Sequence, residues 1–107
     1  MAIYMFQGTY TPEAWAAMVK NPQDRSGVLT EMIEKLGGRL LSFYYCFGEY
    51  DVVATFEAPD DVTASAIVMT AISPGHARTS KTTKLLTIQE TVEAMRKADS
   101  ALYAAPS

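Results

Sequence analysis

A short polar segment, Gly48-Glu49-Tyr50-Asp51, is the sharpest local feature of this sequence. Gly48 permits a positive φ angle, and Asp51 can accept hydrogen bonds from turn amides. Tyr50 can pack its ring at the end of a sheet while its hydroxyl finds a polar partner. Two interpretations stay open. Gly48, Tyr50 and Asp51 form a structural turn that sets the register of two strands, or the segment is a pocket rim that meets a ligand.

The sequence contains one histidine, His76, and one cysteine, Cys46. Two such residues cannot supply the repeated ligands of a zinc site, so we predict no metal and no cofactor. An imidazole suits proton transfer near neutral pH, but His76 is expected at an exposed strand start. Cys46 lies in an aromatic stretch without a cationic neighbour, which favours a buried, unreactive thiol.

Aromatic residues supply walls for a candidate pocket. A small-molecule site needs apolar walls with a few polar groups, and the same side chains can also be core or interface. No catalytic residue is assigned, because no G-x-S-x-G turn is present. The candidate ligand-binding residues are Tyr4, Trp15, Tyr44, Tyr50, His76 and Arg78.

The overall composition narrows the partners. The 107 residues carry a net charge of −3, whereas nucleic-acid binders show a basic surplus, so we expect no nucleic-acid partner. No apolar run is long enough to span a membrane, and no signal peptide is apparent. A lone cysteine cannot form an internal disulfide, which favours a reducing compartment, and we predict a cytoplasmic location.

Hydrophobic periodicity and turn residues predict the elements. Thr11-Pro12 and Asn21-Pro22 each resemble a helix start, and Thr87 with Glu90 resembles a capping box. Strands are predicted over residues 2–10, 39–47, 51–58 and 76–87, and helices over residues 11–19, 21–36, 59–72 and 87–101.

The order of these elements is β-α-β-β-α-β with an additional C-terminal helix. This order is the split βαβ pattern of an α+β, ferredoxin-like fold with an antiparallel sheet. Residues 1–107 are therefore expected to form one domain.

The second predicted strand is apolar on both faces. One face would carry Leu41, Phe43, Tyr45 and Phe47, and the other Leu40, Ser42, Tyr44 and Cys46. Since helices can cover only one face, the other would expose aromatic rings to water. We therefore predict self-association as a homodimer or a higher even oligomer; the alternative is that the last helix folds across the open face.

Several segments in order resemble the GYD-domain family, named for a Gly-Tyr-Asp signature. They are the helix end at Gly37-Gly38, the turn Gly48-Glu49-Tyr50-Asp51 and the helix start at 57–61, within a similar region of roughly 28–98. Glu49 separates Gly48 from Tyr50, so the signature is not contiguous here.

The resemblance implies a dimeric α/β barrel. The effector-binding domains of Lrp/AsnC regulators and the cofactor-free monooxygenases and isomerases share that architecture. It therefore favours a homodimer that binds a small molecule. The alternatives are a cofactor-independent monooxygenase or isomerase acting on an aromatic or dicarbonyl substrate, with a tyrosine or His76 transferring the proton, and a purely structural interaction module.

Overall fold

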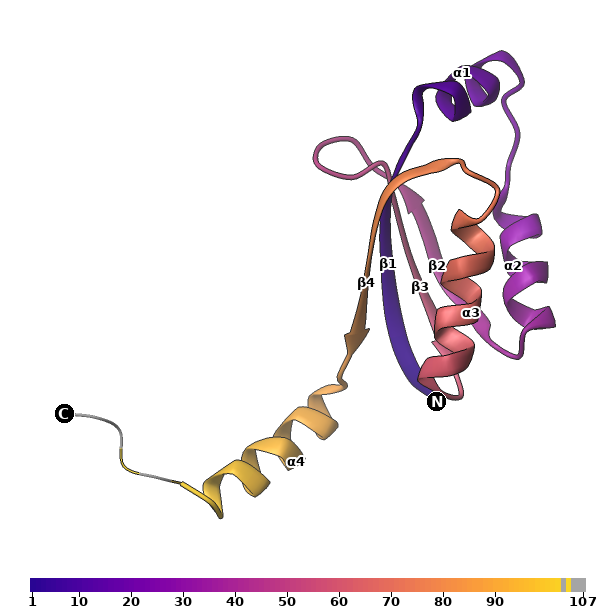
Figure 1. Ribbon diagram of the computed structural model, residues 1–107. Helices are drawn as coiled ribbons and strands as arrows, with labels where there is room; N and C mark the ends of the chain where they lie inside the picture. Colours follow the sequence, from indigo (N-terminus) through magenta and orange to yellow (C-terminus); the bar gives the residue numbers. More distant parts are fainter. Residues whose placement is uncertain (103, 105–107) are drawn as a thin grey trace.

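The computed structural model describes residues 1–102 and 104. The described residues form four strands and four helices, in the order β1-α1-α2-β2-β3-α3-β4-α4 (Figure 1). The elements are β1 (Ala2–Tyr10), α1 (Pro12–Lys20), α2 (Ser26–Lys35), β2 (Arg39–Tyr45), β3 (Val52–Ala58), α3 (Asp61–Ile72), β4 (Ala77–Leu85) and α4 (Ile88–Asp99).

The strands form one antiparallel sheet in the order β2-β3-β1-β4. Helices α2 and α3 lie side by side on one face of the sheet, and α1 lies beyond one end of it (Figure 1). The predicted α+β, ferredoxin-like arrangement is confirmed. None of the described helices is long and apolar enough to cross a membrane.

The core lies between this sheet and the two helices. Side chains alternate across a strand, and β3 shows this cleanly, with Val52, Ala54, Phe56 and Ala58 all buried. The Tyr4 ring of β1 stands opposite Phe56 and stacks on it at 5.4 Å between centroids. The central cluster of buried residues comprises Tyr4, Ile33, Phe56, Ala58, Ala64 and Ile67.

A register shift in β2 changes the predicted faces of that strand. Leu40 pairs with Phe56, but Ser42 pairs with Thr55, so the pairing shifts around Leu41. A bulge of this kind moves every following side chain to the other face. Leu40 therefore shares the helix-covered face with Phe43 and Tyr45. Leu40 was predicted on the face opposite to Phe43 and Tyr45, because strict alternation along the strand was assumed.

The open face is consequently less aromatic than the sequence suggested. From β2 it carries the exposed ring of Tyr44, which stands opposite Val53. Ile3 stands opposite Leu85, and Met5 lies on the same face two residues along β1. Polar residues of β1, β3 and β4 stand among these, so the face is mixed.

Side-chain caps set the helix starts. Thr11 accepts from the Ala14 amide, Asp60 from the Thr63 amide, and the predicted capping box of Thr87 and Glu90 is present. Helix α2 begins later than predicted, because Asp24 holds the Ser26 amide at 2.9 Å and residues 21–25 remain outside the helix.

Helix α4 projects from the end of β4, clear of both faces of the sheet (Figure 1). The alternative in which it covers the open face is therefore not what the structure shows. The radius of gyration is 17.6 Å, against about 13 Å for a compact domain of this size. Ile88, Val92 and Met95 recur at helical spacing on α4 and are all exposed.

Candidate functional site

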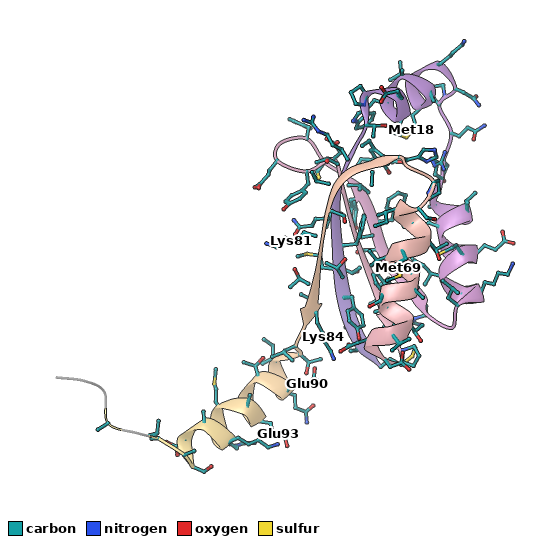
Figure 2. The ribbon with its side chains drawn as sticks, viewed as in Figure 1. Met18, Met69, Lys81, Lys84, Glu90 and Glu93 are labelled. Carbon is teal, nitrogen blue, oxygen red and sulfur yellow. The ribbon has the colours of Figure 1, made fainter. Side chains whose placement is uncertain are left out.

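An apolar cavity of about 390 Å³ lies between the sheet and the helices, at the end of the sheet nearest α1. Phe6 of β1, Phe43 of β2 and Phe56 of β3 form its sheet side. Met18, labelled on α1 in Figure 2, contributes to the end wall, and Met32 of α2 to the helix side. Few polar side chains interrupt this lining.

Small residues create the space. Gly8 and Ala54 lie on the sheet side, and Ala14, Ala17 and Ala71 on the helix side. A Cβ added to Gly8 would come within 3.0 Å of the Phe6 ring, which is closer than packed carbons normally approach. The hollow therefore follows from short side chains at facing positions.

Tyr10, Arg25 and His76 belong to the lining of the cavity, and we call these three residues the rim; Thr9 and Thr70 also line the cavity. Burial raises the pKa of the Tyr10 phenol to about 12, with Tyr45 adding to the shift and Arg25 opposing it. A phenol with so high a pKa is a hydrogen-bond donor at neutral pH, not a base. The rim can therefore donate hydrogen bonds to a ligand in the cavity.

The turn motif supports this rim. The sequence suggested that the Asp51 carboxylate accepts hydrogen bonds from turn amides, but its described donors lie outside the turn. Its Oδ2 accepts from the Tyr10 amide at 2.9 Å and from Trp15 Nε1 at 3.3 Å. The Trp15 ring contacts the Tyr10 ring edge-on at 5.4 Å. Gly48, at φ 144°, adopts the positive φ that was predicted. These contacts favour the structural interpretation of the motif, with Asp51 holding β1, α1 and β3 together.

The structure does not bring the six predicted ligand-binding residues around one cavity. His76 lines it, whereas Tyr4 and Tyr44 lie on opposite faces of the sheet because their partners Phe56 and Val53 do. Trp15 borders a shallower hollow beside α1. Tyr50 is half-buried in the turn.

Arg78 is kept from the cavity wall by a second irregularity. Thr9 pairs with Thr79, but Tyr10 pairs with Ala77, so Arg78 is the extra residue. Ala77 lines the cavity and Arg78 is exposed. In regular pairing, Arg78 would have stood opposite Tyr10.

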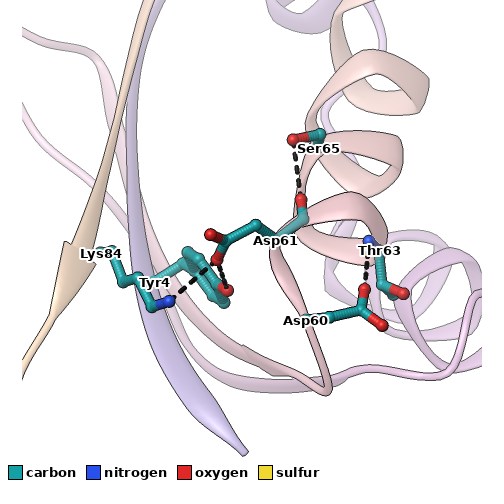
Figure 3. A network of polar contacts seen from close by, with 6 residues as sticks. All are labelled: Tyr4, Asp60, Asp61, Thr63, Ser65 and Lys84. Carbon is teal, nitrogen blue, oxygen red and sulfur yellow. Dashed lines mark hydrogen bonds and ion pairs between the residues drawn. The ribbon is translucent and has the colours of Figure 1, made fainter.

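Tyr4 belongs to a polar network at the other end of β1 (Figure 3). Its hydroxyl donates to Asp61 Oδ1 at 2.5 Å, and Lys84 Nζ lies 3.0 Å from the same oxygen. The hydrogen bond from Tyr4, reinforced by Lys84, lowers the pKa of Asp61, and the bond to Asp61 raises the pKa of Tyr4. We call Tyr4, Asp61 and Lys84 the polar lock, because they join β1, α3 and β4.

Sequence reasoning missed Arg25, Tyr10 and Phe43 as lining residues. Arg25 lies inside the helix predicted over residues 21–36, whereas the structure places it at the cap position before α2. Tyr10 and Phe43 stand opposite Ala77 and Ala54, which also line the cavity, so strand pairing is the signal that identifies them.

Cys46 is exposed, and the predicted burial was wrong. It follows β2, and its Sγ donates to the Tyr50 carbonyl at 3.2 Å within the loop. Within the described residues, no group of three His, Cys, Asp or Glu side chains converges as a metal site would need.

Solved structures share the fold at low sequence identity. MtbAldR superposes with a TM-score of 0.59 at 13% identity, covering 80% of this chain and 53% of that chain. TTHA0845 from Thermus thermophilus gives 0.53 at 18% identity, covering 81% and 95%. An antibiotic biosynthesis monooxygenase gives 0.50 at 16% identity, covering 82% and 99%.

This chain thus spans about half of MtbAldR. At such identities the likeness concerns the fold alone. No curated protein matches the sequence.

The family comparison covers most of the chain. The sequence model of the GYD domain matches residues 4–95. This range contains the Gly48-Glu49-Tyr50-Asp51 turn, the cavity and the polar lock. The chain therefore belongs to the GYD-domain family.

Proposed function

We propose that this protein is a homodimer that binds an apolar small molecule in the cavity between the sheet and its helices. The observation that carries the proposal is the cavity itself. Its volume of about 390 Å³ falls within the range of about 300–1,000 Å³ typical of ligand pockets. Apolar walls with a few polar side chains, Tyr10, Arg25 and His76 among them, also fit such a pocket.

The composition of the walls favours a flat or aromatic ligand. Phe6, Phe43, Phe56 and Tyr10 place rings around the space, and aromatic side chains stack well on flat ligands. Methionines 18 and 32 adapt to irregular shapes. A ligand here would replace solvent against apolar surface, which is the main source of binding free energy.

Binding of N-phenyl-1-naphthylamine, a neutral fluorescent probe, tests the proposal. We expect saturable fluorescence enhancement with the wild type. Ala17→Phe should weaken it, because Ala17 lines the cavity. Ala16→Phe on the same helix is the matched control, since both alanines are exposed and Ala16 lies outside the lining.

Native mass spectrometry of the freshly purified protein would in addition detect a ligand carried from the cell. The absence of both saturable probe binding and a carried ligand would refute the binding function. If Ala17→Phe and Ala16→Phe weakened probe binding equally, the probe would bind outside the cavity.

The open face of the sheet supports the homodimer. Ile3, Met5 and Leu85 gather at one end of it, and Val53 with Tyr44 at the other. Apolar groups distributed over a face that no helix covers favour association with a second copy.

Sedimentation velocity at micromolar concentration tests the assembly. Val53→Lys should shift the dimer toward monomer, because it places a charge among the apolar side chains of that face, opposite Tyr44. Val62→Lys, on the exposed side of α3, should leave the dimer intact. A monomeric wild type would refute this part of the proposal.

A cofactor-independent monooxygenase or isomerase is the second candidate. The observation that favours it is the place of His76, whose imidazole can transfer protons, at the rim of an apolar cavity. Turnover of aromatic or dicarbonyl substrates, lost in His76→Ala at unchanged melting temperature, would support it. A panel with no turnover would eliminate it.

A further inference from the structure

The cavity has an uneven distribution of charge. Arg25 is the one side chain in its described lining that is charged at all pH values, and no Asp or Glu lines it. The chain as a whole is negative, at −3, so a cation at this wall runs against the overall charge. A lone cation beside an apolar space is a feature that a ligand can use.

Arg25 has no acidic partner among the described residues. The two ion pairs there join Arg39 to Glu57 and Lys84 to Asp61. Asp24, its neighbour in sequence, accepts instead from the amide and hydroxyl of Ser26, at 2.9 and 2.6 Å. These bonds lower the pKa of Asp24 and fix it at the start of α2. The guanidinium of Arg25 therefore keeps its donors available.

The backbone of Arg25 is held in place. Its carbonyl accepts from the Leu29 amide at 3.2 Å as the first bond of α2, and Leu29 also lines the cavity. Arg25 opposes the rise that burial produces in the pKa of the half-buried Tyr10 phenol. Arg25 and Tyr10 both line the cavity, so two groups that can donate hydrogen bonds border the same apolar space.

We infer that the cavity selects ligands with an apolar, ring-containing body and one anionic group, and that Arg25 binds that group. The inference rests on the proposed binding function and names its ligand class. A guanidinium fits a carboxylate with two parallel hydrogen bonds. Tyr10 and His76 add donors at the same rim, while the phenylalanine rings receive the body of the ligand.

The test compares two probes with the same ring system, 2-naphthoate and the neutral 2-naphthalenemethanol, by calorimetry at pH 7.5. Wild type should bind the naphthoate about tenfold more tightly, the factor expected of a hydrogen bond to a charged group. Arg25→Gln should remove this preference and change affinity for the alcohol less than about twofold, within ordinary context effects.

Arg78→Gln is the matched control, because it removes the same charge from the same end of the molecule but outside the lining. It should leave the preference for naphthoate in place. Equal losses in Arg25→Gln and Arg78→Gln would overturn the inference in favour of a general charge effect. Equal affinities of wild type for both probes would also overturn it, while leaving the proposed function standing. Failure of both probes to bind the wild type would refute the inference and the proposed function together.

Discussion

The two ends of β1 carry tyrosines in contrasting surroundings. Tyr4 and Tyr10 both face the helix-covered side of the sheet. Tyr4 is held in the polar lock by Asp61, beside a well-filled core. Tyr10 stands at the rim of a cavity, and its amide is held by Asp51.

The cause of each pKa shift shows the same contrast. A hydrogen bond to a carboxylate dominates at Tyr4, whereas burial dominates at Tyr10. On the same face of β1, Tyr4 therefore packs in the core and bonds to α3, whereas Tyr10 lines the cavity. Neighbouring side chains decide which role it takes.

The largest effect on the free energy of unfolding is expected at a residue that contacts both the core around Tyr4 and the cavity near Tyr10. Phe56 is 2% exposed, stacks on Tyr4 and also lines the cavity. Phe56→Ala should lower the free energy of unfolding by about 3–5 kcal/mol, measured by urea denaturation. Phe47→Ala, at a fully exposed position, should change it by less than about 0.5 kcal/mol. Similar values for both variants would show that the ends do not depend on a common core.

An intermediate effect is expected at the cavity end. Asp51→Ala removes the acceptor of the Tyr10 amide and of Trp15 Nε1, and an unpaired donor costs about 1–3 kcal/mol. Binding of N-phenyl-1-naphthylamine should weaken as well, because the rim loses its anchor. Glu49→Ala in the same turn serves as the control. Loss of stability with unchanged probe binding would show that Asp51 supports the fold but not the cavity.

The smallest effect is expected at the polar lock, since Asp61 and Lys84 are largely exposed and solvent screens their attraction. The folded pKa of Asp61 is lowered below the usual aspartate value of about 3.9. Its contribution to stability is therefore present above that value and is lost as pH falls through the folded pKa. Wild type should be more stable than Asp61→Asn at pH 7, and the difference should shrink below about pH 4. The measurement is the urea midpoint of each protein as a function of pH. If the midpoints of wild type and Asp61→Asn differed by the same amount at every pH, the ionised form of Asp61 would not stabilise the polar lock.

Local signals predicted much of the fold. The caps at Thr11 and Asp60 and the capping box at Thr87 depend on residues three positions apart, so the sequence displays them directly. The four strands and their antiparallel arrangement followed from hydrophobic periodicity, turn residues and the order of the elements along the chain. Helix α2 was placed too early because Asn21-Pro22 resembles a start signal, while the chain uses Asp24 and Ser26.

Pairing irregularities limited the prediction of the site. The shift near Leu41 and the extra residue at Arg78 arise from contacts between strands, which no local pattern encodes. Strict alternation therefore placed Leu40 and Phe43 on opposite faces, although they share one. It also gave no reason to favour Ala77 over Arg78 as a lining residue. Arg25 was missed because its role depends on tertiary placement.

The extra residue in β4 also has a consequence for how the cavity can change in evolution. With Thr79 fixed opposite Thr9, loss of the single codon for Ala77 would leave Arg78 as the residue opposite Tyr10. A methyl group would give way to a guanidinium at the wall without any substitution. Strand length, as much as residue identity, thus provides a genetic route to a different charge in the cavity.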